Sequence, residues 1–137
     1  LFKAKRICDG RWVEGYYLRD QYHIGGKDII FYRKDSDRFT VYTDRIDIET
    51  LCQFTGLCDK NGKKIWENDI FQYTDETMVT QKDLIEYNET YASFVRLRNT
   101  EKLGLQYLWI DEATCNHGEV IGNIFDNKEL LQEESDE

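Results

Sequence analysis

Apolar and aromatic residues occur in short runs along this chain, and most runs end at glycine, asparagine or a charged residue. Runs of this length, with turn residues about every ten positions, favour antiparallel β-strands. Residues 2–7 and 12–18 flank Asp9 and Gly10, so they predict an N-terminal hairpin. Further strands are expected at residues 29–32, 39–42, 84–87, 92–97, 107–110 and 120–125, and those at 84–87 and 92–97 are expected to form a hairpin around Asn88.

Two short segments give more specific expectations. Asn61 and Gly62 both tolerate a positive φ, which predicts a hairpin closed by a two-residue type I′ turn. Residues 45–49 alternate between polar and apolar. In an extended segment this alternation places Ile46 and Ile48 on the same face.

These elements predict a mainly β fold, of the β-rich α+β class. We expect antiparallel strands with a small SH3-like barrel core over residues 50–125, an N-terminal hairpin region and a short C-terminal helix. That helix should begin after Asn127, because asparagine is a favourable N-cap. One β-rich domain is expected over residues 1–131, with any subdivision near residues 43–49, and an acidic tail over residues 132–137.

The net charge of the 137-residue chain is −9, and much of it lies at the C-terminal end. Five acids and no base occupy the last nine positions: Glu129, Glu133, Glu134, Asp136 and Glu137. Without these five acids the net charge is −4, so the tail is either a solvated end or an interaction arm. An acidic surface repels phosphate groups, so nucleic acid is a disfavoured partner and a basic protein is a favoured one.

No apolar run approaches the roughly 20 residues that a membrane helix requires, and the first ten residues contain no hydrophobic signal-peptide core. No membrane partner is therefore expected, and the expected location is the cytoplasm. The chain begins without Met, which suggests that its first residue is not the translational start.

The segment at residues 50–73, TLCQFTGLCDKNGKKIWENDIFQY, resembles the signature of the YopX family of phage and prophage proteins. The matching positions are Gln53, Phe54, Thr55, Gly56, Leu57, Asp59, Lys60, Asn61, Gly62, Lys63, Ile65, Glu67, Asp69 and Ile70. A closing segment also matches, at Val120, Ile121, Gly122, Asn123, Ile124, Phe125, Asn127, Glu129, Leu130 and Leu131, and residues 11–16 are similar to the family's start. Asn68 replaces the usual glycine, and asparagine is the next most tolerant residue of a left-handed backbone.

The resemblance implies a small, cytoplasmic, phage-encoded accessory protein of β-rich fold. It carries over no catalytic residue and no cofactor. Its signature consists of turn formers, small residues and core residues, which is typical of a structural role: Gln53, Thr55, Gly56, Asp59, Asn61, Gly62, Glu67, Asp69, Gly122 and Asn123.

Basic residues are densest around the predicted hairpin at residues 59–63. Lys60, Lys63 and Lys64, with the aromatic Trp66 close in sequence, could contact nucleic acid or another anion. The alternative is that these lysines solvate an exposed hairpin tip. A metal-dependent hydrolase built on Glu67, Asp69, Asp75 and Glu76 is a weaker hypothesis, because Asp69 follows a turn residue and is well placed to fix the turn instead.

The cysteines do not indicate a metal site or a nucleophile. Cys8, Cys52, Cys58 and Cys115 lack the paired short spacing of a zinc site, and His23 and His117 do not complete one. Cys115 and His117 would share a face on a strand, but Asn116 and Gly118 favour a loop there.

The remaining surface signal is aromatic. Nine tyrosines exceed what a domain of this size buries to the hydroxyl, so some are expected at the surface. They could close a homo-oligomer or simply occupy the solvent face of strands. The sequence therefore favours a non-enzymatic protein-binding module with no cofactor and an unidentified host or phage protein as partner, with nucleic-acid binding through the residue 60–64 hairpin as the alternative.

Overall fold

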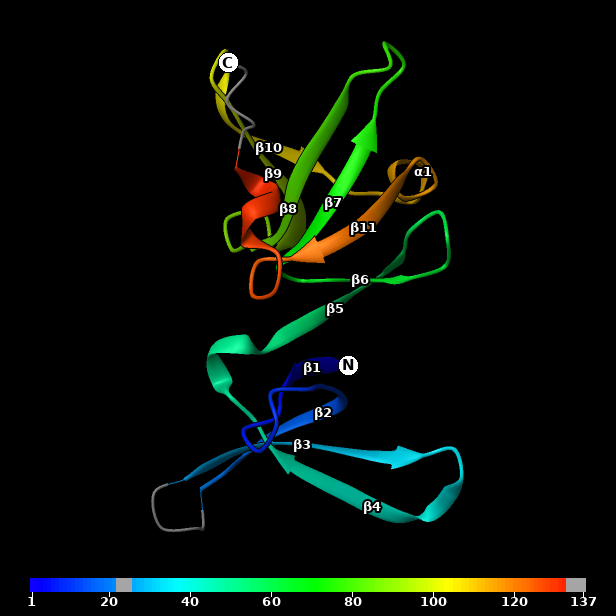
Figure 1. Ribbon diagram of the computed structural model, residues 1–137, viewed down its shortest axis with the longest axis vertical. Helices are drawn as coiled ribbons and strands as arrows, with labels where there is room; N and C mark the ends of the chain where they lie inside the picture. The colour runs from blue at the N-terminus through cyan, green and yellow to red at the C-terminus, as the bar shows by residue number, and fades with distance from the viewer. Residues whose placement is uncertain (22–25, 133–137) are drawn as a thin grey trace. The chain divides into compact units, whose positions relative to one another are not determined.

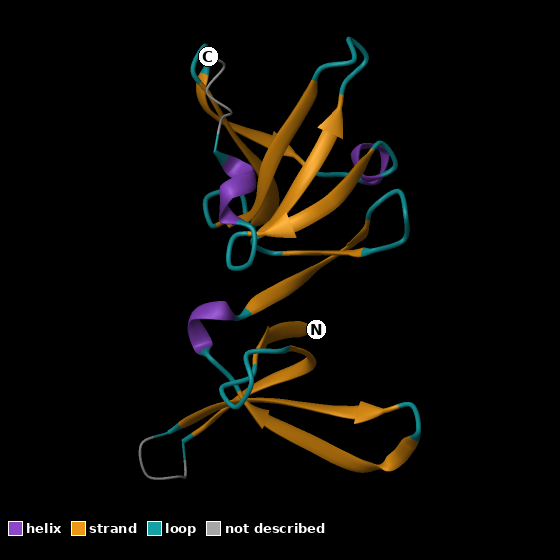
Figure 2. Cartoon of the chain, in the orientation of Figure 1, coloured by secondary structure: helices purple, strands orange, loops and turns teal. Residues whose placement is uncertain are grey.

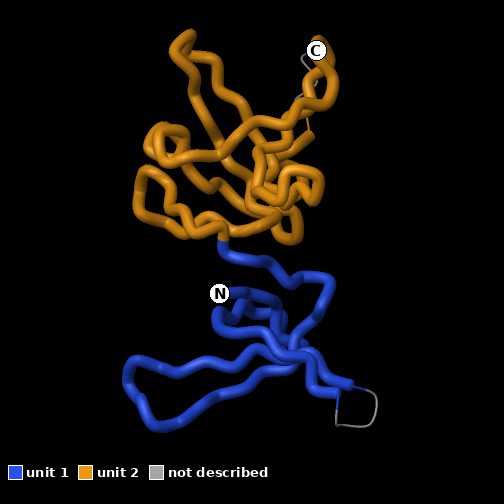
Figure 3. Tube along the Cα trace, turned by 180° about the vertical axis from the view of Figure 1, so that it is seen from behind, with its two compact units in different colours: residues 1–54 blue, residues 55–137 orange. Residues whose placement is uncertain are grey.

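The computed structural model describes residues 1–21 and 26–132. The chain divides into two compact units, Leu1–Phe54 and Thr55–Glu137 (Figure 3). The prediction of one domain over residues 1–131 stays a prediction. The acidic tail, except for Gln132, and His23 lie outside the described residues.

Strands and tight turns make up most of the described chain (Figures 1 and 2). The elements are β1 (Phe2–Lys5), β2 (Trp12–Asp20), β3 (Lys27–Lys34), β4 (Asp37–Arg45), η1 (Ile48–Thr50), β5 (Cys52–Cys58), β6 (Lys64–Trp66), β7 (Asp69–Thr74), β8 (Thr80–Asn88), β9 (Ser93–Thr100), β10 (Gly104–Trp109), α1 (Glu112–Cys115), β11 (Gly118–Asn123) and η2 (Lys128–Leu131). The strand orders are β4-β3-β2-β1-β5-β6 and β10-β9-β8-β7-β11. The predicted mainly β class is confirmed. The described strands form two antiparallel sheets and no closed barrel, so the SH3-like form of the core is not confirmed.

The unit Leu1–Phe54 begins with the predicted N-terminal hairpin, which is confirmed. β1 pairs antiparallel with β2, with Phe2 opposite Gly15, and β2, β3 and β4 continue as a meander. A Cβ atom at Gly15 would lie 2.3 Å from the carbonyl oxygen of Phe31, so only glycine allows β2 and β3 to approach this closely. The buried cluster of this unit consists of Ala4, Val13, Ile30 and Ile46.

The expectation that Ile46 and Ile48 share a face is wrong. Ile46 is 2% exposed and Ile48 is 40% exposed. The extended backbone ends just after β4, because the Asp47 carboxylate accepts a hydrogen bond from the backbone N–H of Glu49 (3.1 Å) and begins the 3₁₀ turn η1. The strand period therefore does not apply across this segment.

In the unit Thr55–Glu137, the sheet β10-β9-β8-β7-β11 packs one face against a core of Ile65, Phe71, Ile85 and Cys115. The predicted hairpin around residues 84–97 is confirmed as β8 and β9, whose pairing includes Leu84 with Leu97. Asn68 has a φ of +69°, the left-handed conformation that the sequence predicted for this position.

The turn at residues 59–63 differs from its prediction. Of its residues only Gly62 has a positive φ (+78°), whereas a type I′ turn requires a positive φ at Asn61 as well. The backbone N–H of Asp59 donates to the carbonyl oxygen of Lys63 (2.8 Å), and that of Gly62 donates to the carbonyl of Asp59 (2.9 Å). The hairpin is therefore closed by three residues, with glycine in the left-handed position.

The C-terminal helix is a 3₁₀ turn, η2, rather than an N-capped α-helix. The Asn127 side chain makes no cap hydrogen bond to this turn. Its Oδ1 instead accepts from the backbone N–H of Asn123 (3.3 Å), which ties the residue back to the end of β11. The turn begins after Asn127, as predicted, but it lacks the expected side-chain cap because the amide oxygen is used in this other bond.

Candidate functional site

Strand β10 is the edge strand of the five-stranded sheet (Figure 1). It pairs with β9 in an unbroken register from Gly104 opposite Thr100 to Trp109 opposite Val95. No strand of the described chain pairs with its other side. An edge of this kind presents backbone N–H and C=O groups that a further strand can use.

The outward side chains of β10 are large and apolar. Leu105, Tyr107 and Trp109 alternate along the strand and are 55%, 51% and 63% exposed. Tyr91, from the turn between β8 and β9, is 58% exposed, and its ring meets that of Trp109 edge-on at a centroid distance of 5.5 Å. We call Tyr91, Leu105, Tyr107 and Trp109 the β10 aromatic surface. Side chains of this kind are enriched at protein interfaces.

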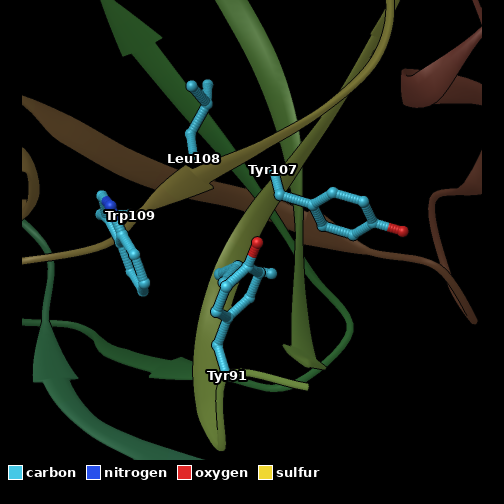
Figure 4. Close-up of a pocket in the computed structure, with 5 residues that line it drawn as sticks. Tyr91, Tyr107, Leu108 and Trp109 are labelled. Atoms are coloured by element: carbon cyan, nitrogen blue, oxygen red, sulfur yellow. The ribbon is translucent and has the colours of Figure 1, made fainter. Parts of the chain in front are cut away.

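A pocket of about 150 Å³ opens within this surface (Figure 4). Its lining residues are Tyr91, Val95, Tyr107, Leu108 and Trp109. Figure 4 shows the Leu108 side chain pointing away from Tyr91, on the opposite side of the strand from Trp109. A cavity of this size accommodates a ligand as large as benzene, so the pocket can accept one apolar side chain.

Buried charges hold the sheet beneath the β10 aromatic surface. Asp83 on β8 is fully buried, and Arg98 on β9 donates to both of its oxygens at 2.7 and 2.9 Å. Arg96 donates from Nη1 to Asp83 (3.0 Å) and from Nε to the carbonyl oxygen of Trp109 (2.9 Å), while its guanidinium lies 5.1 Å from the ring centre of Tyr73. We call Asp83, Arg96 and Arg98 the buried ion cluster. The C-terminal end of β10 is therefore anchored by a charge-assisted hydrogen bond.

The surroundings of β10 are acidic. Glu101 precedes the strand, Asp111 and Glu112 follow it, and all three are exposed. Asp111 also accepts hydrogen bonds from the backbone N–H and the hydroxyl of Thr114, both at 2.8 Å. These bonds lower the pKa of the Asp111 carboxyl, so it stays ionised at neutral pH.

The structure separates the residues that the sequence grouped at the lysine hairpin. Lys60, Lys63 and Lys64 are exposed, whereas Trp66 is only 4% exposed and belongs to the core. Trp66 is therefore not available beside the lysines as an aromatic contact. Nucleic-acid binding by the lysines themselves stays a prediction.

Several residues of the family signature make hydrogen bonds to backbone groups. Asp59, 5% exposed, accepts through Oδ1 from the N–H groups of Asn61 (2.9 Å) and Lys63 (3.0 Å), and through Oδ2 from Val120 on β11 (2.9 Å). Lys60 adds a backbone hydrogen bond to the carbonyl of Gly118 (3.1 Å). The signature turn is thereby attached to the outer side of β11.

The other signature residues lie in turns or strands. The hydroxyl of Thr55 donates to the carbonyl of Ile65 (2.7 Å), and Asp69 Oδ2 accepts from the N–H of Trp66 (2.8 Å). Asn123 Oδ1 accepts from the N–H groups of Phe125 and Asp126, both at 2.9 Å. The remaining positions are Gln53 and Gly56 in β5, Gly62 in the hairpin turn, Glu67 between β6 and β7, and Gly122 in β11.

The acidic residues proposed as metal ligands are not brought together. Among the described residues, no three His, Cys, Asp or Glu side chains are grouped so as to hold a metal ion. Asp69 is buried at its turn, while Asp75 accepts from the N–H groups of Thr77 (2.9 Å) and Val79 (3.1 Å). Glu76 is exposed in the same loop.

Cys115 and His117 do not form a nucleophilic pair on a strand. Cys115 ends the short helix α1 and is 2% exposed, whereas His117 is exposed in the turn that follows. Burial is the main reason that the pKa of the Cys115 thiol rises to about 11. The thiol is therefore protonated at neutral pH and is a weak nucleophile.

In the sequence, Tyr91 and Tyr107 are two of nine tyrosines expected in part at the surface, and no predicted site included Trp109. The missed signal is the alternation Leu105-x-Tyr107-x-Trp109 before two acids. Alternation alone does not say whether the apolar side of a strand faces the core or the solvent. The exposure of this side depends on β10 being an edge strand, and that position is known only from the order of the strands in the sheet.

Fold and site together define a mainly β protein with a covered edge at β11 and an apolar open edge at β10. The chain belongs to the YopX family, because the family model described as "YopX protein" matches residues 1–132. A solved structure of similar fold is that of protein EF1440 from Enterococcus faecalis. It is 23% identical, with a TM-score of 0.50 and 96% of each chain covered. No curated protein matches the chain at a significant level.

Within the described residues, no helix has the length and apolar character needed to span a membrane.

Proposed function

We propose that this chain is a non-enzymatic accessory protein, encoded by a phage or prophage, that binds another protein through the β10 aromatic surface. The observation that supports the proposal is the exposure of Leu105, Tyr107 and Trp109 on one edge strand. A contiguous apolar patch beside polar residues is a feature of interaction sites. Membership of the YopX family supports the phage origin. The expected setting is the cytoplasm of the host bacterium.

The charges favour a basic partner. The chain carries −9 overall, and three exposed acids flank β10 in sequence. Opposite charge on a partner would speed association and orient it, while the apolar contacts would supply most of the affinity. A phosphate backbone is a poorer match for the same reason.

An affinity pull-down from host lysate, with and without nuclease, tests this function. We expect a protein partner that survives nuclease and whose recovery falls about tenfold or more with Trp109→Ala, because a central aromatic residue often dominates binding energy. Tyr16→Ala is the matched control, since Tyr16 is 59% exposed on a strand of the other unit and its ring also meets an aromatic neighbour, Phe31. Equal recovery by all three proteins would contradict the proposal.

Two other results would redirect the assignment. A captured species that disappears on nuclease treatment, and that is lost when Lys60, Lys63 and Lys64 are replaced by Glu, would favour nucleic-acid binding. Catalytic turnover abolished by Asp69→Asn would contradict a non-enzymatic role.

A further inference from the structure

We propose that the partner binds β10 by strand addition. The bound segment is extended, carries Lys or Arg at its flanks, and places one apolar side chain in the pocket between Tyr91 and Trp109. This inference rests on the proposed function and adds the binding mode and the chemistry of the partner. It is argued from the sheet edges, the pocket and the charges.

The other sheet edges of the described chain have features that hinder pairing. β4 has a register shift opposite β3 between Tyr32 and Lys34, and its Arg45 carbonyl already accepts from the N–H of Ile7 (3.0 Å). β6 contains only three residues. Bulges, short strands and occupied backbone groups are common protections of a strand edge.

The edge at β11 is covered. Val120 donates its N–H to Asp59, and the Gly118 carbonyl accepts from Lys60. The β11 register is also shifted between Val120 and Gly122. β10 has six residues in continuous register with β9. The bond from Arg96 to the backbone of β10 lies at the last residue, the carbonyl of Trp109. Of the four edges, β10 therefore offers the best template for a strand.

The pocket adds side-chain selection to backbone pairing. Along an added strand, alternate side chains point to one face of the sheet, which here is the face of Leu105, Tyr107 and Trp109. A side chain on that face meets a pocket of about 150 Å³ lined by aromatic and aliphatic groups. In strand addition, backbone hydrogen bonds provide affinity, and pockets for alternate side chains provide specificity.

Charge defines the flanks of the bound segment. In residues 101–112 the exposed charged side chains are Glu101, Lys102, Asp111 and Glu112, so acids outnumber bases by three to one. A basic residue at either end of the added strand can pair with an acid. The attraction is stronger at the end with Asp111 and Glu112, because Lys102 offsets Glu101 at the other end. The same acids disfavour a single-stranded nucleic acid on the aromatic side chains.

A displayed library of random peptides of about ten residues, the upper range of strand lengths, is the probe. Selected on the full chain, the peptides should contain an apolar residue between basic flanks. Their affinity should fall about tenfold or more with Trp109→Ala and stay unchanged with Tyr16→Ala. Acidic winners, or none whose binding depends on Trp109, would overturn the inference.

Backbone methylation of the best peptide then isolates the binding mode. Two versions of the peptide carry N-methyl groups on every second residue, one version on the odd-numbered residues and the other on the even-numbered residues. An added strand directs every second N–H to β10, so one version should lose about tenfold in affinity and the other should retain it. Loss or retention of binding in both versions would overturn strand addition. If Trp109→Ala still abolished binding, the proposed function would survive this result.

A second copy of the chain is the competing occupant. Sedimentation of the purified protein, with and without Tyr107→Lys, measures this directly. Self-association that Tyr107→Lys removes, at a concentration where the selected peptide no longer binds, would overturn the assignment of a basic partner. A monomer that binds the peptide supports it.

Discussion

The two edges of the five-stranded sheet, β11 and β10, are treated in opposite ways. At β11 the Asp59 carboxylate and the Lys60 N–H occupy the outer backbone groups. At β10 the outer side has no strand partner in the described chain, and its exposed side chains are aromatic or aliphatic. The difference shows that the signature segment covers one edge of the sheet, whereas the other edge is left open.

The largest effect is expected from the buried ion cluster on the β10 side. Asp83→Asn leaves the buried Arg96 and the partly buried Arg98 without a compensating charge, so the free energy of unfolding should fall by about 3–5 kcal/mol. Urea unfolding of the full chain measures this loss. Glu76→Gln, at an exposed loop residue, is the control and should change stability by less than about 0.5 kcal/mol.

Asp59→Ala should open the opposite edge. It removes the acceptor of three backbone N–H bonds, at Asn61, Lys63 and Val120, and should cost about 2–3 kcal/mol. Amide hydrogen exchange should accelerate at Val120, while the amides of β10 keep their native rates. Uniform acceleration over both edges would show that the sheet does not treat them independently.

The core below the sheet should lose stability in alkali. Because the folded pKa of Cys115 is raised to about 11, the unfolded thiol loses its proton first. The contribution of the protonated Cys115 thiol to the free energy of unfolding is complete below the ordinary thiol pKa. It is lost as pH rises toward about 11. Thermal unfolding measured from neutral to alkaline pH should show this loss of stability. Cys115→Ala should make the decline of stability with pH less steep, whether or not it also lowers stability at pH 7.

Gly62→Ala tests the turn that carries Asp59. With a φ of +78° at this position, alanine should destabilise the chain by about 1–2 kcal/mol. Gly62→Asn should cost less, because asparagine tolerates a left-handed backbone. Equal losses in urea unfolding would contradict this account of the turn.

The smallest change in stability is expected at β10 itself. Trp109→Ala retains the backbone carbonyl that Arg96 binds and removes a side chain that is 63% exposed. The free energy of unfolding should therefore change by about 0.5 kcal/mol or less. A loss near 3 kcal/mol would mean that the β10 aromatic surface is part of the core.

Local chemistry was enough to predict the N-terminal hairpin, the β8–β9 hairpin and the left-handed Asn68. It failed where a side chain competed for the backbone: Asp59 holds Asn61 and Lys63 in a wider turn, and Asn127 bonds to Asn123 instead of capping a helix. Trp66 was misplaced beside the lysines because proximity in sequence does not give burial. The candidate site depends on sheet order, which arises from pairing between distant segments.

The buried ion cluster also restricts how the hairpin of β8 and β9 can align. In the native register Leu84 lies opposite Leu97, which brings Asp83 beside Arg98. A slip of one residue would turn one strand over and leave a charge in the interior without its partner. The cluster thus disfavours misaligned pairings of β8 and β9 relative to the native one. Through the bond from Arg96 to the carbonyl of Trp109, it also ties the end of β10 to the same register.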